Sequence, residues 1–122
     1  MNTVAYIRGG KDGFSSLSSM EEQEKMIKKY SSKQGYKIIK IFKEEGVYGA
    51  NFNRPAFQEM LDYIQTSKEK VKFLFVLDLS RLARSTAELF RLKGFLGKKG
   101  VKLISVVDSM LKDIGKQPKQ PS

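Results

Sequence analysis

The feature that most constrains the fold is the segment from Val71 to Leu77, in which every residue except Lys72 is apolar. A run of this kind is typical of a central parallel strand that is covered on both faces. Three other strand-like segments lie at residues 3–7, 36–42 and 101–107, and helical segments separate all four. This βαβαβαβ order predicts a three-layer α/β/α fold with right-handed crossovers and a mostly parallel four-stranded sheet.

The ends of the helices carry signals of their own. The spacing of Ser19 and Glu22 predicts a capping box at the start of the first helix, and Gly35 is expected to end that helix. Pro55 is expected in the first turn of the second helix, where proline is tolerated. The other expected boundaries are a loop over residues 44–53 and a third helix over residues 85–99 that Gly100 closes.

A length of 122 residues suits one domain with a core of its own. The helix and strand pattern continues to about Val107 and fades from Asp108 onward. The last residues, 117–122, are rich in proline and glutamine and resemble a frayed end. We therefore expect a domain over residues 1–107 and a tail, or the start of a linker, over residues 108–122.

The composition excludes several kinds of chemistry. Cysteine and histidine are both absent, which removes disulfides, thiol catalysis, the usual zinc ligands and the usual general base. We expect neither a metal nor another cofactor. The sequence shows no apolar stretch of membrane-spanning length and no secretory signal, so a cytoplasmic protein without membrane contact is expected.

The charge of the chain favours a polyanionic partner. Lysine and arginine number 23 against 13 aspartate and glutamate, a formal net charge of +10. Such an excess attracts nucleic acid first, although lysine-rich helix surfaces alone also raise the charge of a soluble protein.

Arginines follow two of the expected strands. Arg8 comes directly after the first strand, and Arg81 and Arg84 come shortly after the apolar run, spaced to share one face if the segment is helical. Ligands bind at the carboxyl ends of the strands in open α/β sheets. Three guanidinium groups at that end would form a phosphate site, since each can bind phosphate oxygens in pairs. Asp78, at the end of the third strand, is a candidate for orienting one of the arginines or a simple strand-ending acid.

Taken together, five segments resemble the catalytic domain of the serine recombinases, the resolvase/invertase family. The resemblance covers Thr3 to about Val107, and all five segments stand in the family's order and spacing. They are Tyr6-Ile7-Arg8, Ser19-Met20-Glu21-Glu22-Gln23, Glu45-Gly46-Val47-Tyr48-Gly49, Asn53-Arg54-Pro55 and Ser80-Arg81-Leu82-Ala83-Arg84.

The resemblance implies a site-specific DNA recombinase, used in resolution, inversion or DNA integration. Such enzymes cut DNA by attack of a serine hydroxyl, form a 5′-phosphoserine link, exchange strands by subunit rotation and rejoin them without a cofactor. It implies catalytic, phosphate-binding roles for Arg8, Arg81 and Arg84, an outer phosphate contact for Arg54 and a supporting role for Gln23. It also implies DNA as partner and a homo-oligomer, a dimer or tetramer, in the full-length protein.

The sequence departs from the family where the nucleophile should be. The family's serine lies two residues after the arginine that matches Arg8, and that position is Gly10 here. Glycine has no hydroxyl, so this chain is expected to be impaired or inactive in cleavage. Three explanations stay open: a natural inactive relative, an engineered change, or attack by another serine in the same region, namely Ser15, Ser16, Ser18 or Ser19.

Two other functions compete with the recombinase. The first is a non-catalytic DNA-binding, dimerisation or regulatory module on the same fold. The second is a nucleotide-binding module, but Gly9 and Gly10 lack the spaced glycines and the Lys-Ser/Thr pair of a P-loop. The family's dimerisation helix and DNA-reading domain find no counterpart here, so we expect an excised domain or truncated product whose DNA binding is weak, salt-dependent and without sequence choice.

Overall fold

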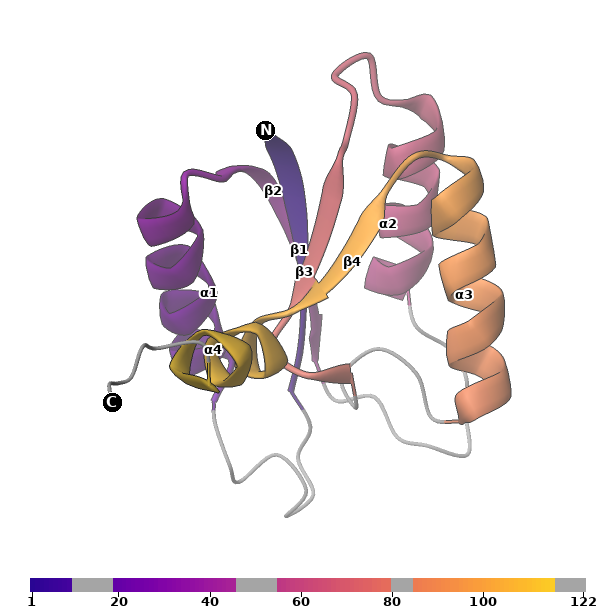
Figure 1. Ribbon diagram of the computed structural model, residues 1–122. Coiled ribbons are helices and arrows are strands. Elements are labelled where there is room, and N and C mark those ends of the chain that lie inside the picture. Colours follow the sequence, from indigo (N-terminus) through magenta and orange to yellow (C-terminus); the bar gives the residue numbers. More distant parts are fainter. Residues whose placement is uncertain (10–18, 46–54, 80–84, 116–122) are drawn as a thin grey trace.

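A computed structural model describes residues 1–9, 19–45, 55–79 and 85–115 of the chain (Figure 1). Four strands alternate with four helices along these residues. The elements are β1 (Asn2–Gly9), α1 (Met20–Gln34), β2 (Lys37–Glu45), α2 (Pro55–Thr66), β3 (Phe73–Val76), α3 (Thr86–Lys98), β4 (Lys102–Ser105) and α4 (Val106–Gly115).

The four strands form one parallel sheet in the order β2-β1-β3-β4. Helices α1 and α4 cover one face, and α2 and α3 cover the other (Figure 1). The three-layer α/β/α fold expected from the sequence is thereby confirmed. All carboxyl ends of the strands lie at one end of the sheet, because the strands are parallel.

The core consists of two apolar clusters, one on each face of the sheet. Leu74 and Val76 of β3 belong to the cluster beneath α2 and α3, with Met60 and Leu96 from those helices. Phe75 of the same strand belongs to the cluster beneath α1 and α4. Strand β3 is therefore buried on both faces, as its apolar sequence predicts.

The helix ends follow their local sequence signals. Ser19 caps α1, and the reciprocal contact from Glu22 completes the expected capping box. Gly35 ends that helix with φ of 82°, a left-handed conformation that glycine adopts at no steric cost. Pro55 is the first residue of α2. These three features are confirmed.

Several element boundaries differ from the expectation. Arg8 was expected to follow the first strand, but β1 continues through Arg8 and Gly9 because both residues pair with β2, and β3 is shorter than its apolar run. Strand β2 continues through Glu44 and Glu45, which were expected in a loop, because both residues pair with the end of β1. Strand β4 ends at Ser105 rather than at Val107, because the Val107 amide leaves the sheet and donates to the Leu77 carbonyl at 2.9 Å. The following residues form α4 up to Gly115. That residues 108–122 act as a tail or linker stays a prediction.

Candidate phosphate-binding site

The candidate site lies where β1 ends, between β2 and β3. Arg8 is the penultimate residue of β1, half-buried, and pairs in register with Glu44 of β2. Side chains alternate along a strand, so Arg8 leaves β1 on the same face as Tyr6, which packs beneath α2 and α3. A guanidinium at this position can reach a ligand at the carboxyl end of the sheet.

Glu44 is the buried acid of this region, with 2 % of its surface exposed. Its Oε1 accepts from the Tyr6 hydroxyl at 2.9 Å and from the Phe57 amide at 3.0 Å. Its Oε2 accepts from the Ala56 amide at 3.1 Å. The carboxylate therefore binds two free amides at the start of α2 and ties three elements together. These three neutral donors already bind the carboxylate oxygens of Glu44. Glu44 can therefore lie beside Arg8 in the sheet without forming an ion pair with the Arg8 guanidinium.

Gln23 reaches the same end of β1 from α1. It is fully buried, and its Nε2 donates to the Arg8 carbonyl at 3.0 Å. Its Oε1 is also buried, and the described residues offer it no hydrogen-bond donor. Gln23 thus holds the backbone of Arg8, and its second polar atom has no partner among the described residues.

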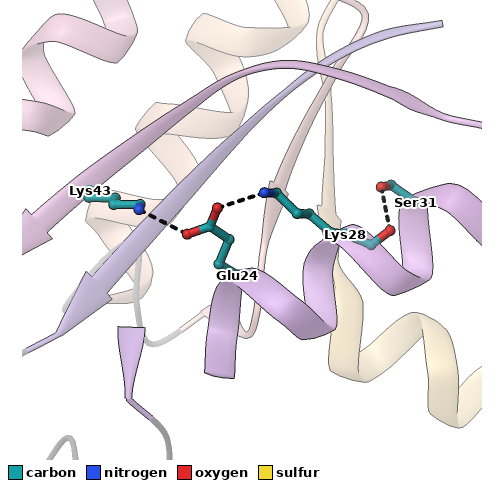
Figure 2. Close-up of polar contacts among 4 residues, drawn as sticks. All are labelled: Glu24, Lys28, Ser31 and Lys43. Atoms are coloured by element: carbon teal, nitrogen blue, oxygen red, sulfur yellow. Dashed lines mark hydrogen bonds and ion pairs between the residues drawn. The ribbon is translucent and has the colours of Figure 1, made fainter. Parts of the chain in front are cut away.

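The first turn of α1 is fixed against the strands by further contacts. A Cβ atom at Gly9 would come within 2.6 Å of Met20 Cγ, so glycine allows this close approach. Figure 2 shows Glu24 between Lys28, at 2.8 Å, and Lys43 of β2, at 2.9 Å. Hydrogen bonds from Lys28 and Lys43 lower the pKa of the Glu24 carboxyl. The Glu24–Lys28 pair lies within α1, whereas the Glu24–Lys43 pair joins α1 to β2. Partly exposed pairs of this kind contribute about 0–1 kcal/mol.

The structure brings three of the sequence-predicted site residues to one region. Arg8 and Gln23 meet directly, and half-buried Asp78 lies two residues beyond the end of the adjacent strand β3. The other four, namely Gly10, Arg54, Arg81 and Arg84, lie outside the described residues, so their placement stays a prediction. In the part of the chain that the structure describes, no cluster of acidic side chains suits a metal ion, and no helix is long and apolar enough to cross a membrane.

Comparison with known proteins decides the family. The model of the family "Resolvase, N terminal domain" matches residues 3–119. The chain belongs to the resolvase family. A search of curated proteins found no match.

Solved structures agree on the fold of this resolvase-family domain. A resolvase family site-specific recombinase from Streptococcus pneumoniae is 25% identical with a TM-score of 0.77, covering 95% of this chain and 86% of that one. The N-terminal catalytic domain of TP901-1 integrase is 22% identical with a TM-score of 0.74, covering 95% of each chain. The C-terminal catalytic domain of ISC1926 TnpA, an IS607-like serine recombinase, is 18% identical with a TM-score of 0.72, covering 93% of this chain and 78% of that one.

Sequence reasoning missed the part that Glu44 plays in this resolvase-family domain. One signal was available: the residue before Pro55 is Arg54, which is not a helix-capping type, so an acceptor from elsewhere is needed. A second signal is that Glu44 follows Phe42 at strand spacing, on the buried side of β2. Gln23 is completely buried, but in the sequence only the resemblance to the serine recombinases singled it out as a candidate.

The buried Oε1 of Gln23, which has no donor among the described residues, leads to a prediction about stability. Replacing Gln23 with leucine removes the bond to the Arg8 carbonyl, and it also removes a buried oxygen that has no partner among the described residues. The two effects oppose each other, each about 1–3 kcal/mol. We therefore expect the free energy of unfolding in urea to change by less than about 1 kcal/mol, comparable with Lys25→Leu on the exposed side of α1. A much larger loss would show that Oε1 has a donor in the folded protein.

Proposed function

We propose that this chain is the catalytic domain of a serine recombinase that acts on DNA, with its own strand cleavage impaired at Gly10. The observation that carries the proposal is the position of Arg8, at the carboxyl end of β1, with its carbonyl bonded to Gln23 and its neighbour Glu44 occupied by other donors. Membership of the resolvase family supplies the reaction class.

The chemistry needs positive charge around one phosphodiester. A serine hydroxyl loses its proton as its oxygen forms a bond to phosphorus, and the bond from phosphorus to the 3′ oxygen breaks. The 3′ oxygen takes up one proton and leaves as a hydroxyl, so one proton passes overall from the serine to the leaving group. Arg8, Arg81 and Arg84 would stabilise the charge on the non-bridging oxygens of the transition state, with Arg54 as an outer contact. Rejoining is the reverse reaction after subunits of a dimer or tetramer have rotated.

Gly10 cannot perform the first step, because it has no side chain to attack phosphorus. Ser19 is a poor substitute, since its hydroxyl oxygen accepts the Glu22 amide at 3.1 Å as the cap of α1. Ser15, Ser16 and Ser18 lie outside the described residues and stay open as alternatives. If no other serine attacks, the chain is either a natural inactive relative that pairs with a functional recombinase or a recombinase domain that carries an engineered inactivating change.

A paired cleavage assay tests the proposal. The chain, joined to a recombinase dimerisation helix and DNA-binding domain, is compared as it stands and with Gly10→Ser. We expect trapped 5′-phosphoserine DNA in the serine form alone. Covalent product in both forms would mean that another serine attacks.

The same assay separates the recombinase from its main alternative, a non-catalytic DNA-binding, dimerisation or regulatory module. Such a module predicts no covalent product in either form, provided that an active relative cleaves in the same fusion. It also predicts that replacing Arg81 and Arg84 with alanine leaves its role intact, whereas the recombinase needs both arginines.

A further inference from the structure

Lysines gather at the end of the sheet opposite Arg8. The amino ends of the strands, and the connections that lead into β2, β3 and β4, all lie at this end (Figure 1). Every lysine here is exposed. We name this surface the lysine pole; it consists of Lys33, Lys37, Lys68, Lys70, Lys72, Lys98, Lys99 and Lys102.

Three of these lysines lie in a row across the sheet. The Lys37 amide donates to the Met1 carbonyl at 3.0 Å, and the Lys72 amide donates to the Asn2 carbonyl at 2.8 Å. The Lys102 amide then donates to the Lys72 carbonyl at 2.9 Å. These bonds place Lys37, Lys72 and Lys102 within one residue of the same level across four adjacent strands, a span of about 14 Å at the usual strand spacing. Lys102 is in register with Phe73, one position beyond Lys72, so Lys72 and Lys102 leave the sheet on opposite faces.

Acidic side chains do not balance this charge. Within residues 33–37, 68–72 and 98–102, which carry the pole lysines, Glu69 is the one acid. The ion pairs found among the described residues are those of Glu24 with Lys28 and Lys43, and no pole lysine takes part in them. The pole is therefore a surface of uncompensated positive charge.

Ordinary structural roles explain some of these lysines but not all. Lys37 and Lys102 lie on the two edge strands, where lysine discourages pairing between sheets. Lys33 and Lys98 lie in the last turns of helices, where they complement the helix dipole. Lys70 and Lys72 have neither role, because they precede the central strand β3.

We propose that the lysine pole binds the phosphate backbone of duplex DNA, as a second contact remote from Arg8. Duplex DNA carries one negative charge per about 1.7 Å of its axis when both strands are counted, so a length of about 14 Å holds roughly eight phosphate charges, of which the pole would face those on one side. Lysine suits this task, because it binds phosphate as a flexible point charge and reads no sequence. The choice of DNA as the polyanion rests on the proposed function; the pole itself does not depend on the chemistry at Gly10.

Charge-matched triple variants test the proposal. The pole variant replaces Lys70, Lys72 and Lys102 with glutamine, and the control replaces Lys25, Lys29 and Lys93, which are exposed on α1 and α3. Binding of the whole chain to a fluorescent duplex of about 30 base pairs is measured by anisotropy at several salt concentrations. We expect the pole variant to bind about tenfold or more weakly, with a slope of log K against log salt that is lower by about 2–3. The control should keep most of the wild-type affinity and slope.

Equal losses in the two triple variants would overturn the proposal, since they would mean that total charge alone attracts DNA. An unchanged pole variant would overturn it as well. The same binding measurement on Arg8→Ala tests the proposed function independently of the lysine pole. If Arg8→Ala abolishes binding and the pole variant does not, the DNA contact lies at the carboxyl end of the sheet and the pole has no part in it.

Discussion

In a chain whose cleavage has been restored by Gly10→Ser, replacing Arg8 with alanine is expected to lower the rate of DNA cleavage by about 10²–10³-fold, the loss typical of a preorganised donor to a transition-state oxygen. The expected cause is local, because Arg8 is half-buried at the end of β1 and its backbone is held independently by Gln23. The measurement is a single-turnover assay of phosphoserine formation in the fusion that carries the dimerisation helix and DNA-binding domain.

Two further variants make this result specific. Arg91→Ala removes the same charge from an exposed position on α3, and its cleavage rate should stay close to that of the parent. Arg8→Lys keeps the charge but lacks the planar fork, so it should recover part of the lost rate. Unfolding in urea should be nearly unchanged in all three variants. A loss in Arg91→Ala as large as that in Arg8→Ala would contradict the role of Arg8, since it would indicate a general effect of charge on DNA binding.

The features that the sequence predicted well depend on neighbours along the chain. The capping box of Ser19 and Glu22 and the left-handed Gly35 involve contacts within a few residues, so local propensity determines them. The central position of β3 was equally predictable, because its apolar run requires cover on both faces. The alternation of strands and helices likewise predicted the parallel sheet, whereas the order β2-β1-β3-β4 was not predicted.

The features that the sequence did not predict depend on residues far apart in the chain. Glu44 was expected in a loop, and its partners Tyr6 and Ala56 are 38 and 12 residues away. Gln23 shows no local sign of burial, because its partner is the carbonyl of Arg8 on another element. Polar groups of this kind are buried because a distant element provides their hydrogen-bond partners. The spacing of apolar residues along the chain does not identify those partners.

The second large effect is expected at Glu44. Replacing it with alanine should reduce the free energy of unfolding by about 3 kcal/mol or more, because it removes a helix cap worth about 1–2 kcal/mol and leaves the buried Tyr6 hydroxyl without this acceptor, at about 1–3 kcal/mol. Pro55, which begins α2, has no N–H, so the amides of Ala56 and Phe57 are those that lose their acceptor. The measurement is equilibrium unfolding in urea at neutral pH.

Graded substitutions separate the helix cap from the contact with Tyr6. Tyr6→Phe removes one of the three bonds and should cost about 1 kcal/mol, whereas Glu44→Gln keeps a carbonyl acceptor and should fall between Tyr6→Phe and Glu44→Ala. Glu59→Ala, at an exposed position of α2, serves as the matched control and should change stability by less than about 0.5 kcal/mol. If Glu44→Ala were no more destabilising than Glu59→Ala, the buried carboxylate would not anchor α2.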